Sequence, residues 1–201
     1  MNVGERVDTI KNWILGYVNS MPKKANTLVV GVSGGIDSAV VSTISSMTGI
    51  DTIVLSMPIK QIKTQDDLSK LHCNWLVENF KNTKYLNIDL DSVFSNFENV
   101  VGSNNNEHAF ANSRARLRMT TLYQVAGSNN GIVVGTGNKV EDFGVGFYTK
   151  YGDGGVDISP IADCTKTEVW EMGEFLEIDH KIISAPPTDG LWIDGRNDED
   201  Q

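Results

Sequence analysis

The sequence predicts an α/β fold, a Rossmann-like parallel sheet with helices on both faces. Short runs rich in β-branched residues alternate with segments in which apolar residues recur every three or four positions. These two patterns are typical of buried strands and amphipathic helices, and strands that alternate with helices pair in parallel. Ligands of such folds bind at the carboxyl ends of the strands, so the residues that follow each strand are the candidates for function.

The first half of the chain contains three expected strands. Val7, Ile10, Ile14 and Val18 recur at helical spacing, and Pro22 ends the helix that they predict. The expected elements, in order, are a helix over about 6–19, a strand over 28–32, a helix to about residue 47, a strand over 52–55, a helix that includes 68–76 and a strand over 85–89. Three such units in succession make the parallel sheet the expected core.

The second half of the chain is less regular, and its helical pattern weakens between residues 91 and 106. Thr165 and Glu168 have the spacing of a capping box, which predicts the start of a helix. The expected elements are a polar loop at 103–106, a long helix over about 107–126 that Gly127 ends, a buried strand over 131–135, a loop dense in glycine and charge, and the helix that begins at Thr165.

Length and composition are those of one ordinary globular domain, which we expect to span residues 1–201. The chain has 40% hydrophobic and 21% charged residues, and it contains no internal repeat and no long linker. Its 17 basic and 26 acidic residues give a net charge of −9, which argues against a nonspecific nucleic-acid surface or an anionic-membrane surface. We therefore expect neither nucleic acid nor a membrane as a partner.

The two cysteines, Cys73 and Cys164, lack the spacing of metal ligands and have no companion histidine cluster. This pattern indicates structural thiols in a reducing compartment rather than a disulfide. No apolar run reaches about 18 residues, the length that a membrane helix needs. The acidic start of the chain does not resemble a signal peptide, so the expected location is the cytoplasm.

The clearest candidate site is the Ser-Gly-Gly-Ile-Asp-Ser sequence at 33–38, between the first expected strand and its helix. Gly34 and Gly35 lack the Cβ atoms that would keep a ligand away from the backbone, so several N–H groups can point at one anion. The dipole of the following helix adds to this attraction. Phosphate is the expected ligand, and a Gly-rich turn without a ligand is the alternative.

Asp37 distinguishes this loop from the usual phosphate loop of nucleotide hydrolases, which ends in Gly-Lys-Ser or Gly-Lys-Thr. Two anions in contact repel strongly, so Asp37 requires a cation between itself and a phosphate, and Mg²⁺ is suited to that place. Glu141 supplies a second carboxylate if the Gly-Thr-Gly-Asn-Lys-Val-Glu run at 135–141 faces the loop across the sheet. Taken alone, a glutamate at a helix start is more often a partner of the helix dipole.

Two further stretches carry groups suited to a second substrate. Arg114, Arg116 and Arg118 stand at every second position of the long expected helix, where they can grip an anionic substrate or form a solvated basic face. The 146–161 stretch combines aromatic rings, a lysine, acids and glycines, as expected of a loop that wraps a substrate. Lys166 opposes the dipole of the helix that it begins, which suggests a bound anion.

Together these segments resemble the ammonia-dependent NAD⁺ synthetases, a family of N-type ATP pyrophosphatases. The Ser-Gly-Gly-Ile-Asp-Ser loop is similar to the pyrophosphate-binding loop of the whole superfamily, and the Lys-Tyr-Gly-Asp-Gly run at 150–154 separates this family from the others. The matching segments are 33–38, 112–119, 135–141, 146–161 with Lys166 and Thr167, and 186–189. The resemblance implies the adenine nucleotide alpha hydrolase-like form of the Rossmann-like fold.

The resemblance also implies a reaction. Enzymes of this family transfer AMP from ATP to the nicotinate carboxylate of deamido-NAD⁺, release pyrophosphate, and let ammonia displace AMP to give NAD⁺. A carboxylate is inert toward ammonia until one oxygen becomes a good leaving group, which adenylation achieves. The implied substrates are ATP, deamido-NAD⁺ and ammonia, and the implied cofactor is Mg²⁺, held by Asp37 and Glu141.

Roles for individual residues are implied where this sequence matches the motifs of the family. The implied catalytic residues are Asp37, Lys166 and Asp153. The implied ATP and pyrophosphate site comprises Ser33, Gly34, Gly35, Asp37, Ser38, Thr136, Lys166 and Thr188. The implied deamido-NAD⁺ site comprises Asn112, Arg116, Lys150 and Asp157. Asp153 and Asp157 match acids of the substrate and ammonia pocket, where a carboxylate can retain ammonium and help to deprotonate it.

The family forms homodimers whose long arginine-bearing helix belongs to the interface, and we expect a homodimer here. Its members usually continue for several tens of residues beyond the equivalent of 198–201, so we expect a shortened C-terminal end. The 184–195 segment is expected to close over the site as a lid. No segment resembles a glutamine-hydrolysing domain, so ammonia would come from solution or from a partner.

Two alternatives remain open from the sequence. A GMP synthetase-like N-type pyrophosphatase would share the phosphate loop but would lack the 112–119 and 149–157 stretches. A shortened, nonenzymatic or weakly active nucleotide-binding protein of this family would keep the fold with little or no turnover. The intact acids at positions 37, 141, 153 and 157 argue against that second alternative.

Overall fold

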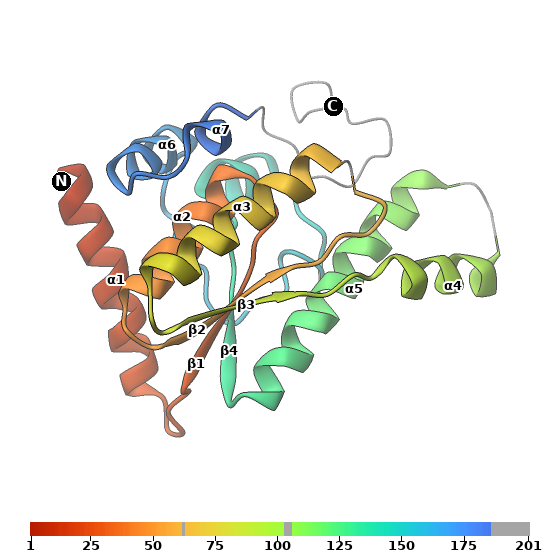
Figure 1. The fold of residues 1–201 in the computed structure, drawn as a ribbon, viewed down its shortest axis with the longest axis horizontal. Coiled ribbons are helices and arrows are strands. Elements are labelled where there is room, and N and C mark those ends of the chain that lie inside the picture. Colours follow the sequence, from red (N-terminus) through yellow and green to blue (C-terminus); the bar gives the residue numbers. More distant parts are fainter. Residues whose placement is uncertain (62, 103–105, 186–201) are drawn as a thin grey trace.

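A four-stranded parallel sheet forms the centre of the protein (Figure 1). The computed structural model describes residues 1–61, 63–102 and 106–185, except for the side chain of Phe143. The strands are β1 (Thr27–Gly31), β2 (Asp51–Ser56), β3 (Thr83–Asn87) and β4 (Gly131–Val134). Each neighbouring pair of strands is parallel, as the alternation of strands and helices predicts.

The order of the strands determines where a ligand can bind. Along the sheet the strands lie in the order β3-β2-β1-β4. The chain therefore moves outward from β1 to β3 and then returns to the other side of β1 to form β4. Loops that follow β1 and β4 diverge at this reversal, and in open parallel sheets the crevice between them is the usual ligand site.

Helices cover both faces of the sheet (Figure 1). On one side lie α1 (Val3–Ser20), α2 (Ile36–Met47), α3 (Lys63–Asn79), α6 (Lys166–Phe175) and α7 (His180–Ile183), and on the other side lie α4 (Asp91–Val101) and α5 (Glu107–Ser128). A short π-helix, η1 (Lys139–Val145), follows β4. α5 packs on β1 and β4, so it forms a wall beside the crevice.

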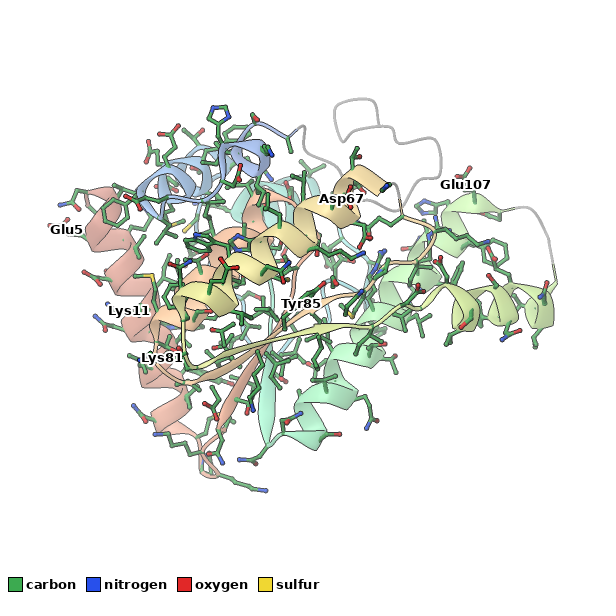
Figure 2. All side chains as sticks on the ribbon, in the orientation of Figure 1. Glu5, Lys11, Asp67, Lys81, Tyr85 and Glu107 are labelled. Carbon is green, nitrogen blue, oxygen red and sulfur yellow. The ribbon has the colours of Figure 1, made fainter. Side chains whose placement is uncertain are left out.

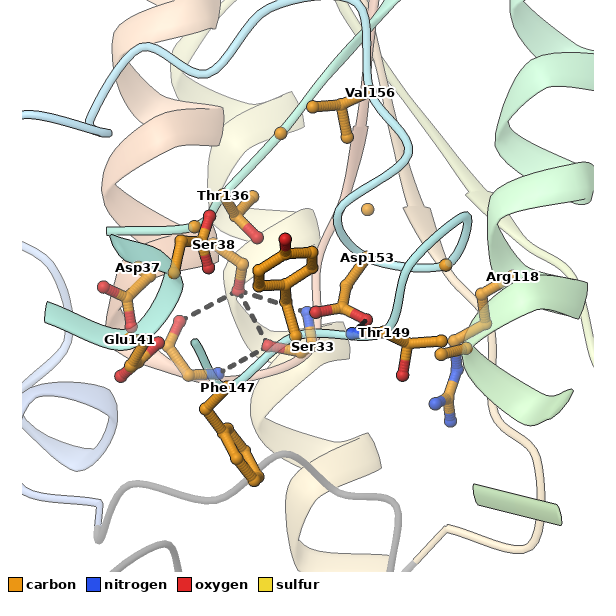
Figure 3. A pocket seen from close by; sticks show the side chains of 18 of the residues that line it. Ser33, Asp37, Ser38, Arg118, Thr136, Glu141, Phe147, Thr149, Asp153 and Val156 are labelled. Carbon is orange, nitrogen blue, oxygen red and sulfur yellow. Dashed lines mark hydrogen bonds between the residues drawn. The ribbon is translucent and has the colours of Figure 1, made fainter. Parts of the chain in front are cut away.

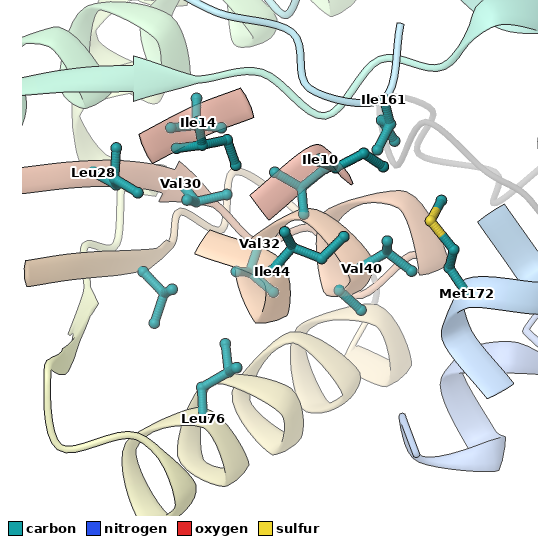
Figure 4. Packing of buried hydrophobic residues seen from close by; sticks show 14 of the residues in the cluster. Ile10, Ile14, Leu28, Val30, Val32, Val40, Ile44, Leu76, Ile161 and Met172 are labelled. Atoms are coloured by element: carbon teal, nitrogen blue, oxygen red, sulfur yellow. The ribbon is translucent and has the colours of Figure 1, made fainter. Parts of the chain in front are cut away.

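Neighbouring residues of β1 pack on opposite faces of the sheet. Leu28 and Val30 join the core beneath α1, α2 and α3, to which Ile44 also belongs (Figure 4). Val29 packs instead with Phe94 and the other buried residues beneath α4 and α5. All three β1 side chains are 0% exposed, which confirms the prediction of a strand buried on both faces.

The outer surface and the first helix agree with the sequence pattern. α1 begins with a capping box in which Asn2 and Glu5 exchange two hydrogen bonds of 2.9 Å, and its four apolar positions face the core as predicted.

Charged side chains such as Glu5, Lys81 and Glu107 point into solvent (Figure 2). Within the described residues, no helix combines the length and the apolar character needed to cross a membrane.

The sequence predicts a weak helical pattern between residues 91 and 106, but the structure has a helix, α4, over most of this segment. Its apolar residues do recur at helical spacing, but Phe94 alone among them is buried. Val93, Phe97 and Val100 face solvent, so the pattern is not that of a helix packed on its own core. Residues 103–105 of the expected polar loop lie outside the described residues.

Two predicted boundaries were wrong. α5 continues through Gly127 to Ser128, since a glycine costs a helix only about 1 kcal/mol relative to alanine. The chain turns instead at Asn130, which has a φ of 48°, a left-handed conformation that asparagine tolerates. The third strand lies two residues before the predicted 85–89, because its pairing with β2 runs from Thr83 to Asn87.

His72 is a buried titratable group between α2 and α3. It is 2% exposed, and its Nε2 lies 3.1 Å from both the Ser42 hydroxyl and the Ala39 carbonyl oxygen. Burial lowers the pKa of His72 from its ordinary 6.5 to about 4. The unfolded chain therefore takes up a proton at a higher pH than the folded protein, so stability is lost as the pH falls through this interval.

We expect acidification from pH 7 to pH 5 to lower the free energy of unfolding by about 2 kcal/mol through His72 alone. Urea unfolding at the two pH values measures the change. The His72→Gln variant has no titratable group at this position, so its loss should be smaller by that amount. Equal losses in the wild type and the variant would show that His72 does not take up a proton on unfolding.

Candidate functional site

A cleft of about 520 Å³ opens at the carboxyl ends of β1, β2 and β4. Residues 33–38 are called the phosphate loop from here on. All of them except Gly34 line one wall, together with Glu141 and Lys166. α5 and the 146–156 segment line the opposite wall. Figure 3 shows Asp37 and Glu141 on one side and Arg118 on the other. The cleft lies where the order of the strands predicts a ligand.

The phosphate loop is held by its own serines. Ser33 N donates to Ser38 Oγ at 3.1 Å, Gly35 N donates to Ser33 Oγ at 3.2 Å, and the Ser38 hydroxyl donates to Gly35 O at 2.9 Å. Gly34 has a φ of 95°, and a Cβ there would lie 2.6 Å from Gln65 O, so this position requires glycine. The N-cap Gly35 provides no side-chain acceptor for the first amides of α2, and an anion can satisfy them.

Three charged side chains from three helices meet beside the phosphate loop. Lys166 Nζ on α6 lies 2.5 Å from Asp37 Oδ2 on α2 and 2.8 Å from Glu141 Oε1 on η1. Their side chains are 18%, 15% and 32% exposed, respectively. The sequence singles out each residue separately, and the fold brings them into one cluster.

Burial and charge act in opposite directions on this cluster. Burial raises the pKa of Asp37, and the neighbouring Lys166 opposes that change. Burial alone would lower the pKa of Lys166, but the charges of Asp37 and Glu141 outweigh it and raise that pKa. A protonated ammonium thus lies between two carboxylates. These acids account for a lysine in the first turn of α6, where the sequence suggested a bound anion.

Asn138 connects the two acids, and the sequence analysis did not single it out. It is 0% exposed. Its Nδ2 donates to Asp37 Oδ1 at 3.0 Å, and its Oδ1 accepts from the N–H groups of Val140 and Glu141 as the N-cap of η1. An asparagine that follows a strand, three residues before a glutamate, is the signal that could have identified this cap.

Asp142 is a second cleft residue that the sequence analysis missed. Burial, together with the charges of Asp153, Glu141 and Asp37, raises the pKa of Asp142 to about 6. Asp153 was predicted; it lines the cleft and accepts a hydrogen bond from Thr149 N at 2.9 Å. Carboxylates from both walls therefore interact in the cleft, and such a site favours a cation.

Of the residues predicted for the second substrate, Asn112 lines the cleft. Arg116 and Lys150 are exposed and lie outside the cleft lining, and Arg116 Nε donates to Lys150 O at 3.2 Å. Arg118 lines the cleft instead, with its Nε 3.0 Å from Met57 O. The rotation of α5 about its axis therefore places Arg118, and not Arg116, in the cleft of its own chain.

Asp157 also lies outside the cleft lining. Its carboxylate accepts hydrogen bonds from Val133 N at 2.8 Å and from the Tyr123 hydroxyl at 3.1 Å. These bonds attach the 146–161 stretch to the edge strand β4 and to α5. The predicted ATP-site residues that line the cleft are Ser33, Gly35, Asp37, Ser38, Thr136 and Lys166. Thr188 and most of the expected lid at 184–195 lie outside the described residues.

The paired carboxylates fit a divalent cation. Asp37 Oδ2 and Glu141 Oε1 both contact the Lys166 ammonium, so a single cation can reach both oxygens. Carboxylate oxygens suit Mg²⁺, which usually takes one or two of them and keeps water and phosphate oxygens as further ligands. Among the described residues, there is no group of three or more His, Cys, Asp or Glu side chains that could hold a metal by itself. Phosphate and water would therefore supply the remaining ligands.

Replacing Lys166 by methionine removes the cation that Asp37 and Glu141 share. We expect Lys166→Met to lower the free energy of unfolding by roughly 1–3 kcal/mol in metal-free buffer, because the two carboxylates remain close together without compensation. Mg²⁺ should then raise the Tm of the variant more than that of the wild type, since the metal no longer competes with an ammonium.

Thermal melts with and without Mg²⁺ measure both effects of the Lys166 substitution. Lys139→Met is the matched control, because Lys139 is an exposed lysine at the start of η1. Equal behaviour of the two variants would show that the carboxylates do not depend on Lys166.

Comparison with known proteins gives one consistent result. The family model described as NAD synthase matches residues 6–201. An NH₃-dependent NAD⁺ synthetase from Carboxydothermus hydrogenoformans is 37% identical over 204 residues, an alignment that covers 99% of this chain and 80% of the relative.

Solved structures agree with this match and confirm the Rossmann-like fold. An NMN synthetase from Francisella tularensis has a TM-score of 0.90 and 33% identity, with 100% of this chain and 81% of that chain covered. An NH₃-dependent NAD synthetase from Campylobacter jejuni has a TM-score of 0.81 and 28% identity, with 91% and 77% covered. The sequence resemblance is thereby confirmed, and the chain belongs to the NAD synthase family.

Proposed function

We propose that this protein is an ammonia-dependent carbon–nitrogen ligase, which converts deamido-NAD⁺ to NAD⁺ and cleaves ATP to AMP and pyrophosphate. The observation that carries the proposal is the Asp37–Lys166–Glu141 cluster beside the phosphate loop, in a chain of the NAD synthase family. Relatives named as NH₃-dependent NAD⁺ synthetases support the choice of reaction. The family match also removes the GMP synthetase-like alternative.

The phosphate loop would bind the pyrophosphate end of ATP. Ser33 and Ser38 line the cleft there, and the amino-terminal end of α2 attracts anions. Negative charge grows on pyrophosphate as the bond between the α and β phosphates breaks, so these donors stabilise the transition state more than the ground state. Thr136 lines the same cleft from the end of β4, where it would contact the nucleotide.

Mg²⁺ is the proposed cofactor, with Asp37 and Glu141 as its protein ligands. When bound, it would offset the charge of the phosphates that separate in the first step. Lys166 now contacts the same two carboxylates. It would exchange those contacts for a phosphate oxygen when substrate binds.

The nucleophile of the second step is unprotonated ammonia, whereas at neutral pH most of the ammonia in water is protonated to ammonium. Asp153 lines the cleft close to Asp142, with which it interacts electrostatically. We assign to Asp153 the retention of ammonium and the acceptance of its proton. Ammonia would reach the site from solution or from a partner protein.

We expect Asp37→Asn to keep the fold and to lower turnover at least about a hundredfold, because the carboxylate and its charge are lost while the shape remains. Pyrophosphate release from ATP in the presence of deamido-NAD⁺ and ammonia measures turnover. Asp51→Asn is the control, since Asp51 is exposed at the opposite end of the sheet. Near-normal turnover of Asp37→Asn would contradict the assigned role.

A second candidate substrate comes from one structural neighbour. The Francisella tularensis protein is named an NMN synthetase, which suggests amidation of nicotinate mononucleotide. Nicotinate mononucleotide carries the same nicotinate carboxylate as deamido-NAD⁺ but lacks the AMP half. The same site can therefore catalyse amidation of either acid.

Pyrophosphate release with each acid as the only acceptor decides between these substrates. We expect deamido-NAD⁺ to give the higher kcat/KM by at least about tenfold, a difference of about 1.4 kcal/mol in transition-state binding. A preference for the mononucleotide would make NMN synthesis the function. No release with either acid would favour the nonenzymatic alternative.

A homodimer is the proposed assembly. An apolar stripe along α4 consists of Val93, Phe97, Val100 and Val101, residues that are 49%, 43%, 84% and 53% exposed. Exposed apolar stripes of this kind are typical of protein interfaces, and a second copy of the same chain can cover one. Arg116, Lys150 and Asp157 would then bind deamido-NAD⁺ where it crosses between the subunits.

Phe97→Glu places a charge in the middle of the α4 stripe, so we expect it to shift the protein from dimer to monomer at micromolar concentration. Sedimentation velocity measures the change. Phe175→Glu is the matched control, because Phe175 is 51% exposed on α6. An unchanged dimer in Phe97→Glu would exclude the stripe from the interface.

The cytoplasm is the proposed location. Cys73 and Cys164 are both buried and free. Burial raises the pKa of Cys73 to about 12, so this thiol is not a reactive one. Free structural thiols are typical of proteins kept in a reducing compartment.

A further inference from the structure

Asn138 lies at the junction of the three elements that carry the charged cluster. It directly follows Gly137. A Cβ atom added at Gly137 would collide with the Asp142 carboxylate, so the chain is tightly packed as it enters η1. The next residue, Lys139, donates its backbone N–H to Cys164 O at 2.9 Å, two residues before Lys166. The turn at 137–139 therefore contacts α2, η1 and the segment that leads into α6.

The Asn138 amide contacts both acids of the cluster at once. Its oxygen accepts from Val140 N at 3.0 Å and from Glu141 N at 3.1 Å, and its nitrogen donates to Asp37 Oδ1 at 3.0 Å. The orientation of the amide is determined by these partners, because two N–H donors require the oxygen and a carboxylate requires the nitrogen.

This arrangement links two distant parts of the chain through one rigid group. The oxygen and nitrogen of an amide are bonded to the same carbon, so the distance between the backbone of Glu141 and the carboxylate of Asp37 cannot vary freely. Asn138 is fully buried and does not line the cleft. Its contacts orient Asp37 Oδ2 and place the first turn of η1, from which Glu141 reaches the same ammonium.

We propose that Asn138 is a positioning residue that sets the separation of the Asp37 and Glu141 carboxylates, and with it the affinity of the pair for a divalent cation. The proposal rests on the proposed function, in which these acids hold the metal with ATP. Asparagine has the donor and the acceptor that the position needs, whereas serine or threonine can cap η1 but is too short to reach Asp37 as well.

The Asn138→Ser variant separates the two roles of the side chain, because it keeps a cap for η1 and removes the bond to Asp37. Asn106→Ser is the matched control: Asn106 caps α5, where its Oδ1 accepts from Ala109 N at 3.0 Å, on an element that does not carry the charged cluster. Mn²⁺ serves as the probe in the presence of α,β-methylene-ATP, which the enzyme cannot cleave. Electron paramagnetic resonance reports free Mn²⁺, and thermal melts without metal report stability.

We expect Asn138→Ser to weaken Mn²⁺ binding about tenfold and to leave the metal-free Tm close to that of the wild type. Pyrophosphate release should fall at low Mg²⁺ and recover in part at high Mg²⁺. Asn138→Thr, a second capping variant, should behave alike, while Asn106→Ser should bind Mn²⁺ as the wild type does.

Three results would overturn this role for Asn138. Unchanged Mn²⁺ affinity in both variants would show that the amide does not position the acids. Equal weakening in Asn106→Ser would show a nonspecific effect. A collapse of the metal-free Tm in both variants would make Asn138 a structural residue. By contrast, a wild-type protein that binds no Mn²⁺ and releases no pyrophosphate would overturn the proposed function itself, and this role with it.

Discussion

The contact of one ammonium with two carboxylates is the interaction on which the cleft depends. Asp37 and Glu141 come from segments about a hundred residues apart in the sequence, and their like charges repel at the short distance that a shared partner imposes. Lys166 provides the compensating charge. In the proposed reaction a bound Mg²⁺ would supply that compensation, so substrate binding and the internal ion pairs would use the same two acids.

The fold explains why these groups meet. β1 and β4 are neighbours in the sheet although the chain forms β2 and β3 between them. Asp37 lies in the first turn of the helix after β1, and Glu141 lies in the first turn of the helix after β4. Both strands are buried, so their loops are the parts that remain free to form a site. α6 completes the cluster, because its capped first turn presents Lys166.

Much of the fold and part of the cleft could be predicted from the sequence. The parallel sheet and the helix cap at Thr165 follow from local patterns that need no tertiary information. Asp37, Glu141 and Lys166 stand in motifs that resemble a known family, so each could be named before the structure. Their mutual contact could be inferred only in outline, from the rule that the carboxyl ends of parallel strands share one edge.

The remainder depends on long-range packing. Asn138 looks like an ordinary cap until Asp37 is seen beside it, and Asp142 becomes a cleft residue only because η1 packs against Gly137. Arg118 rather than Arg116 reaches the cleft because of the phase of α5 on the sheet. The apolar stripe of α4 faces solvent, so the helix does not pack that face on the core of its own chain. In our proposal a second copy of the chain covers the stripe, and the sequence of one chain does not show that contact.

The path of one oxygen atom tests the central proposal most directly. If the cleft adenylates the nicotinate carboxylate, one of its two oxygens leaves with AMP when ammonia displaces the nucleotide. Deamido-NAD⁺ labelled with ¹⁸O in that carboxylate, together with ATP, Mg²⁺ and ammonia, should therefore yield AMP that carries one ¹⁸O, as mass spectrometry of the products can show. Label found in pyrophosphate or in inorganic phosphate, with none in AMP, would contradict an adenylated intermediate in this cleft.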